Sequence, residues 1–174
     1  MFDPTIFDNL KVAFENQLYD LDNLDGLIRI TGRTDRLEMS VMSREFAIRF
    51  ELAAAPGIFA EIRLEASLAD LAAEILELKG ESPGCALRIG FGMTGVRAET
   101  DCEKIGQILQ EIWPGIPLVQ TLSRVYGQAS DVYDNAAELR FGRKINEEQM
   151  QDISELITHA LRTLEELTIN LHQP

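Results

Sequence analysis

The chain has 174 residues, 45% of them hydrophobic, and its 29 acidic and 16 basic side chains give a formal net charge of −13. Length and composition indicate one globular domain, 1–174, with a possible subdivision into 1–80 and 81–174 around a shared core. The negative charge argues against nucleic acid or anionic membranes as partners, and no apolar run is long enough to span a membrane.

The first predicted element is a helix with Asp3 as its N-cap, which ends near residues 23–26 and repeats apolar residues every three or four positions. Four strands follow, predicted from an alternation of apolar and polar side chains that is typical of antiparallel strands with one buried face. They are expected at 27–33, 36–42, 45–52 and 58–66. In the second strand, we expect Leu37, Met39 and Val41 to share one face.

The second half of the chain mixes helices and strands. A capping box of Ser67 with Asp70 predicts a helix that ends at Gly80, and a box of Thr100 with Glu103 predicts a helix over 101–113. The other elements expected here are strands at 85–92, 117–126 and 136–144 and a long final helix capped by Asn146 and Gln149.

The predicted order is α-ββββ-α-β-α-ββ-α, which indicates an α+β fold: an antiparallel sheet with helices packed on one face. A leading helix, an antiparallel sheet and a closing helix together resemble the type III secretion chaperone-like fold. The helix expected at 101–113 departs from that pattern. The resemblance implies a domain that holds another protein.

Gly90, Gly92 and Gly95 have the spacing G-x-G-x-x-G, the fingerprint of dinucleotide-binding folds. That motif requires a buried parallel strand followed by a helix that begins inside the glycine turn. Here Arg88 gives the strand a polar face, and the cap at Thr100 places the helix several residues too late. The three glycines are therefore weak cofactor-binding candidates, and no cofactor is expected. An edge or bulged strand that ends in a turn is the preferred interpretation.

Residue types that support catalysis or metal binding are sparse. His159 follows Glu155 by four positions, a spacing typical of a surface ion pair and only weakly indicative of metal or acid–base chemistry. We predict no catalytic residue and no metal site, and an enzyme is not the favoured interpretation. The two cysteines, Cys85 and Cys102, form neither a C-x-x-C pair nor a disulfide framework, and the N-terminus has no secretion signal, which favours a cytoplasmic location.

Charge is distributed unevenly along the chain. Segments 1–26 and 146–174 each have a net charge of −5, whereas the predicted strands over 27–66 are balanced and alternate arginine with glutamate. This alternation predicts cross-strand ion pairs on a solvated face. It also fits a partner-binding face, because arginine and aromatic side chains dominate interface energies. The candidates for partner binding are Arg36, Arg49, Phe59 and Arg63.

The last predicted helix has a heptad-like seam in which apolar residues alternate spacings of three and four. Packing on the chain's own sheet is one use of this seam. The other use is a homodimer, because the helix has a second apolar flank that a second copy could cover. The candidates for a dimer helix are Met150, Ile153, Ile157, Leu164 and Leu167.

Two functions are therefore open. The first is a non-catalytic, cytoplasmic protein-interaction or chaperone-like domain that forms a homodimer. The alternative is a small-ligand-binding protein or enzyme with a pocket near the glycine loop 90–97, Trp113 and Tyr126.

Overall fold

A computed structural model describes residues 5–171, so the N-cap predicted at Asp3 lies outside the described residues. Within them the fold is α+β, as expected, with a six-stranded sheet and four α-helices. The elements in chain order are α1 (Thr5–Asn23), β1 (Ile28–Glu38), β2 (Ser43–Leu52), β3 (Ala55–Ala66), α2 (Leu68–Ile75), β4 (Ala86–Val96), α3 (Ala98–Ile112), β5 (Leu118–Ser123), β6 (Tyr133–Arg140), the 3₁₀ turn η1 (Glu147–Asp152) and α4 (Ile153–Leu171).

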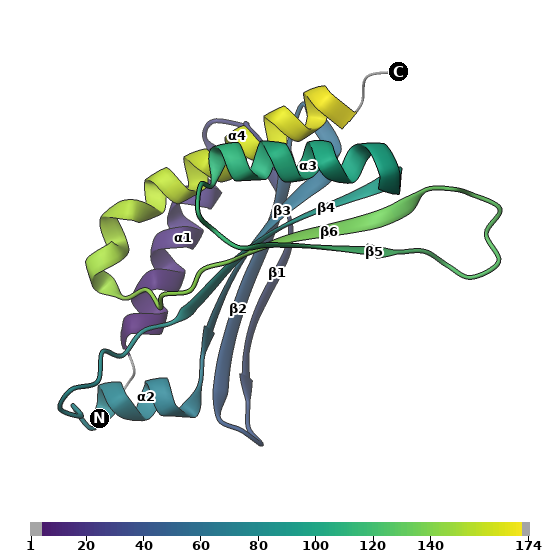
Figure 1. Cartoon of the computed structure of the whole chain (residues 1–174). Helices are drawn as coiled ribbons and strands as arrows, with labels where there is room; N and C mark the ends of the chain where they lie inside the picture. Colours follow the sequence, from purple (N-terminus) through teal and green to yellow (C-terminus); the bar gives the residue numbers. More distant parts are fainter. Residues whose placement is uncertain (1–4, 172–174) are drawn as a thin grey trace.

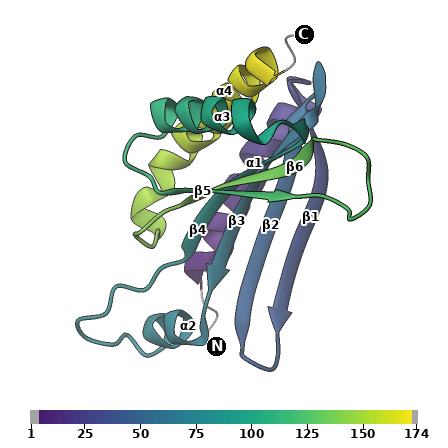
Figure 2. The ribbon, with the colours of Figure 1, turned by 45° about the vertical axis from the view of Figure 1, so that its right-hand side comes forward.

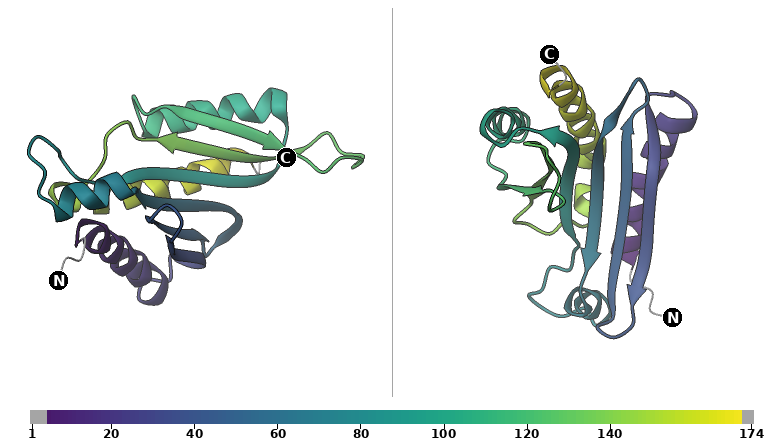
Figure 3. Two further views of the ribbon diagram at one scale, coloured as in Figure 1. Left: turned by 90° about the horizontal axis from the view of Figure 1, so that it is seen from below. Right: turned by 90° about the vertical axis from the view of Figure 1, so that its right-hand side faces the viewer.

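The strands pair antiparallel throughout, in the order β1-β2-β3-β4-β6-β5. Helices α1, α4 and α3 cover one face, which we call the inner face, and α2 follows β3 at one end of the sheet (Figures 1 and 2). The inner face carries the core residues Phe46, Ile48 and Phe50 of β2. The opposite, outer face carries Arg49 and is left uncovered by the helices of residues 5–171; β1 and β2 lie in front of α1 in the right-hand view of Figure 3.

Strand β1 replaces two of the predicted strands, so the order is α-βββ-α-β-α-ββ-α. Residues 33–38 stay paired with β2 instead of turning, and the turn falls at 39–42. A bulge at Thr31 shifts the alternation by one residue, which brings Arg33 and Asp35 to the inner face. The prediction that Leu37, Met39 and Val41 form a buried face is wrong, because these side chains lie at the exposed tip of the β1–β2 hairpin. None of the helices in the described part of the chain is long and apolar enough to cross a membrane.

Two of the three predicted capping boxes are present. Ser67 with Asp70 caps α2, and Asn146 with Gln149 caps η1, which leads into α4. Helix α2 ends at Ile75, earlier than predicted, and the chain then turns through Glu77 at φ 48°.

The predicted box at Thr100 is wrong. Helix α3 begins at Ala98, because the Asp101 carboxylate accepts the backbone N–H of Arg97 at 2.8 Å and caps the helix from within its first turn. Burial opposes ionisation of Asp101, but this hydrogen bond and the nearby positive charge of Arg97 hold its pKa below its ordinary value.

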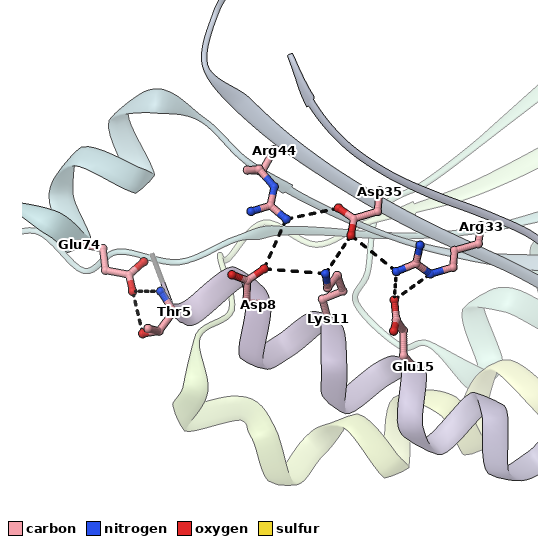
Figure 4. A network of polar contacts seen from close by, with 8 residues as sticks. All are labelled: Thr5, Asp8, Lys11, Glu15, Arg33, Asp35, Arg44 and Glu74. Carbon is pink, nitrogen blue, oxygen red and sulfur yellow. Dashed lines mark hydrogen bonds and ion pairs between the residues drawn. The ribbon is translucent and has the colours of Figure 1, made fainter. Parts of the chain in front are cut away.

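Helix α1 is joined to the sheet edge by a polar network (Figure 4). Asp35 of β1 accepts from Lys11 of α1 at 2.8 Å and from Arg44 of β2 at 3.3 Å. Glu15 of α1 pairs with Arg33 at 2.6 Å. Because hydrogen bonds between charged groups have a defined geometry, this network helps to fix the position of α1 over β1.

Candidate functional site

All four predicted partner-binding residues lie on the outer face. The antiparallel register places Arg36 opposite Glu45, Arg49 opposite Glu61, and Arg63 opposite Arg88. Phe59 lies on the same face, at the end of the sheet near the β2–β3 turn. The basic side chains of this face are all arginine: Arg29, Arg36, Arg49, Arg63, Arg88 and Arg140. Its carboxylates are Glu38, Glu45, Glu51, Glu61, Glu65, Asp134 and Glu138.

These charges form cross-strand ion pairs, as the alternation predicts. Arg36 reaches Glu45 at 2.9 Å, and Arg63 reaches the same carboxylate at 3.2 Å. Within β3, Arg63 also pairs with Glu61 at 2.8 Å. The hydrogen bond to Glu61 is the largest influence on Arg63 and raises its pKa.

Arg88 is the least firmly paired of these arginines. Its one ion pair within residues 5–171 is to Glu138 at 3.9 Å, and its direct neighbours across the sheet are Arg63 and Arg140. Beside it a hollow of about 180 Å³ lies over Gly90, where the strand has no side chain to fill the space. The guanidinium of Arg88 is therefore free to bond to a partner's carboxylate.

The Phe59 ring packs on the backbone of Gly92, and this contact explains why residue 92 is a glycine. A Cβ placed on Gly92 would lie 2.0 Å from Cζ of Phe59, so the ring lies directly on the bare backbone. Cζ of the Arg49 guanidinium lies 3.9 Å from the centroid of the Phe59 ring. Phe59 is thus held between a glycine and an arginine as a flat, half-buried anchor.

The weak cofactor-binding candidates Gly90, Gly92 and Gly95 lie in β4, which pairs antiparallel with β3 and with β6. A bulge between Met93 and Val96 lets the strand turn, with Gly95 at φ 69°. The interpretation as a bulged strand is therefore right in geometry, but β4 is internal and not an edge. Helix α3 begins closer to the glycines than predicted, yet its first turn already holds the Asp101 carboxylate, which disfavours a phosphate there.

The predicted dimer-helix residues lie mainly in the core. Ile153, Ile157, Leu164 and Leu167 are buried, and Met150 packs against the same cluster. The seam thus packs on the chain's own sheet, which was the first of the two uses considered. The four buried residues are therefore not available for contact with a second copy of the folded chain.

A cavity of about 290 Å³ lies between the C-terminal end of α3, the segment after β6 and the start of α4. Trp113 lines it, together with Phe141 and His159, but no residue of the glycine loop 90–97 does. Gly92, Met93 and Thr94 of that loop line a separate hollow of about 320 Å³ beside Phe59. Tyr126 lines neither of them, because its side chain is fully exposed in the β5–β6 connection. Sequence reasoning missed Phe141 as a site residue, since nothing in the local pattern links it to residues on α3 and α4.

The remaining candidate groups have structural roles. Nδ1 of His159 is 2.7 Å from the backbone carbonyl of Glu155, so the surface ion pair predicted between these residues is not formed. Burial raises the pKa of the Cys85 thiol to about 12, which keeps it protonated and unreactive. Cys85 and Cys102 are both free, and residues 5–171 contain no group of histidine, cysteine and carboxylate side chains arranged to hold a metal ion.

No protein-family model, curated protein or solved structure matches the chain. The likeness to the type III secretion chaperone-like fold therefore rests on the order of the elements alone.

Proposed function

We propose that the chain is a non-catalytic protein-interaction domain that binds through the outer face of its sheet and forms a homodimer there. The observation that carries the proposal is the composition of this face: six arginines, no lysine and seven carboxylates, left uncovered by the helices of the described residues. Arginine is favoured at interfaces over lysine, because its planar guanidinium bonds to carboxylates in pairs and stacks on aromatic rings.

Charge favours a second copy as the occupant of this face. Helices α1, α3 and α4 and turn η1 carry 14 carboxylates against three basic side chains, so two copies that approach through their helices repel each other. The outer face is nearly neutral and holds both signs of charge. A two-fold dimer pairs a surface with itself, and such a face can set its arginines against its own carboxylates.

The Arg49–Phe59 stack supports the same proposal. It provides a pre-arranged aromatic anchor with little side-chain entropy left to lose on binding. A chaperone-like role, in which the face holds another polypeptide, is the broader form of the proposal. A cytoplasmic location is part of it as well, because both cysteines are free.

The test is analytical ultracentrifugation of the purified chain and of Arg88→Glu over about 1 to 100 µM, the range of a moderately stable dimer. In the monomer, a glutamate at 88 gains Arg63 and Arg140 as cross-strand partners, so the variant is expected to fold. In the dimer it adds negative charge to both copies of the interface, and we expect dissociation to become at least about tenfold easier.

Arg162→Glu is the matched control, because it makes the same charge change on the helical side, where Arg162 is half exposed. It should leave the dimer unchanged. A wild-type chain that stays monomeric across the range, or equal weakening by both variants, would show that the outer face is not a dimer interface.

A further inference from the structure

The cavity beside Trp113 has three aromatic walls. The rings of Trp113 and Phe141 meet edge to face, with centroids 6.1 Å apart and planes at 83°. The His159 ring lies 5.3 Å from the indole at 47°. All three rings line the cavity, whose volume is about 290 Å³, so a ligand in it would contact aromatic surface.

Hydrogen bonds hold two of these three rings in place. The indole Nε1 donates to the Thr163 hydroxyl at 2.9 Å, and this hydroxyl donates in turn to the His159 carbonyl at 2.7 Å. Because the Glu155 carbonyl can only accept, Nδ1 of His159 donates to it at 2.7 Å, which fixes the orientation of the imidazole. The indole and imidazole walls are thus positioned before any ligand arrives.

Two carboxylates complete the cavity. Asp152 and Glu155 both line it, and within residues 5–171 neither carboxylate has an ion pair or a hydrogen-bond donor, whereas many other carboxylates of the chain are paired with arginine or lysine. Its lining contains no arginine or lysine. The cavity therefore combines aromatic faces, which attract cations through their quadrupoles, with unpaired negative charge.

We propose that this cavity binds a small organic cation, specifically a methylated alkylammonium. Aromatic walls suit the diffuse charge of methylated nitrogen, and the carboxylates supply the opposite charge. A volume of about 290 Å³ accommodates a ligand of this size and lies near the lower limit for small-molecule sites. This inference is independent of the proposed interface, since the cavity lies on the helical side of the sheet.

Trp113 is the only tryptophan of the chain, so its fluorescence reports the cavity directly. Choline is titrated at constant ionic strength, and the uncharged isostere 3,3-dimethylbutan-1-ol is titrated in parallel. We expect a saturable change in emission with choline and binding at least about tenfold weaker for the neutral isostere. Equal binding of both probes, or no saturable change with choline, would overturn the proposal.

Variants separate charge from shape. Asp152→Asn combined with Glu155→Gln preserves the volume of the cavity and should weaken choline binding at least about tenfold. Glu165→Gln is the matched control, because Glu165 is an exposed carboxylate on α4 outside the cavity, and it should bind choline as the wild type does. Phe141→Leu should weaken choline binding about threefold. If neither this variant nor the double variant changes the affinity, choline binds outside this cavity and the proposal is wrong.

Discussion

The choice of residue at one strand position can depend on a side chain of the neighbouring strand, as Gly92, Phe59 and Arg49 show. Gly92 lies in the interior of a strand, where glycine is normally unfavourable. Here the Phe59 ring takes the space that a Cβ would need, and Arg49 stacks on the same ring. The glycine is thus required by a neighbour on β3 and not by a nucleotide.

We predict that Gly92→Ala destabilises the wild-type chain by about 1–2 kcal/mol, because its methyl group displaces the Phe59 ring from its seat. In the Phe59→Ala background the same substitution should be neutral or stabilising, since alanine is the better strand residue. Urea unfolding of the four proteins in this double-mutant cycle measures the difference. Additive effects of the two substitutions would mean that the ring does not occupy this place.

Charged groups join helix α1 to the edge strand β1, beside the apolar packing of the two elements. Burial opposes ionisation of the Asp35 carboxyl, but its hydrogen bonds and ion pairs to Lys11 and Arg44 outweigh that effect and lower its pKa. A carboxyl with a depressed pKa contributes stability above its ordinary pKa of about 3.9, and this contribution is lost as the pH falls through the folded value. The joint between helix and sheet is therefore sensitive to acid.

Asp35→Asn should lower the free energy of unfolding by about 1–2 kcal/mol at pH 7, because it leaves Lys11 and Arg44 without their shared acceptor. As the pH falls below the ordinary pKa of a carboxyl toward the lowered pKa of Asp35, the gap to the wild type should narrow, because the wild type progressively loses the contribution of its ionised carboxylate. Thermal unfolding from pH 7 to pH 3 measures both effects. Asp20→Asn, an exposed position on α1, is the control, and a gap between Asp35→Asn and the wild type that stays constant with pH would contradict this account.

Charge is segregated across the molecule as a whole. The helical layer carries 14 carboxylates and three basic groups, whereas the outer face of the sheet is nearly balanced. Repulsion within the helical layer opposes folding, and salt screens it. The same segregation gives the outer face its distinct character as a binding surface.

Glu103→Lys should therefore raise the free energy of unfolding by about 0.5 kcal/mol at low salt, because it removes one negative charge from the layer and places a lysine four residues after Glu99 on α3. Glu103→Gln should give roughly half of that gain. Urea unfolding at about 20 mM and about 1 M salt measures it, and the gain should disappear at the higher concentration. A gain that survives high salt would have a cause other than charge.

Local signals predicted much of the fold. The capping boxes at Ser67 and Asn146 and the apolar seam of the last helix depend on residues a few positions apart, and each is found in the structure. The box at Thr100 failed because Asp101, with equally good chemistry, caps the helix one turn earlier. The outer-face candidates could be predicted because alternation alone assigns side chains to a face.

Composition and short-range pattern were enough to establish an α+β chain with an antiparallel sheet and one charged face, because these properties depend on residue type and a period of two or 3.6. Three features could be seen only in the tertiary structure. They are the joining of two predicted strands into β1, the packing of Phe59 on Gly92, and the cavity lined by Trp113, Phe141 and His159. Each of these brings together residues from separate elements, and local periodicity carries no information about which elements meet.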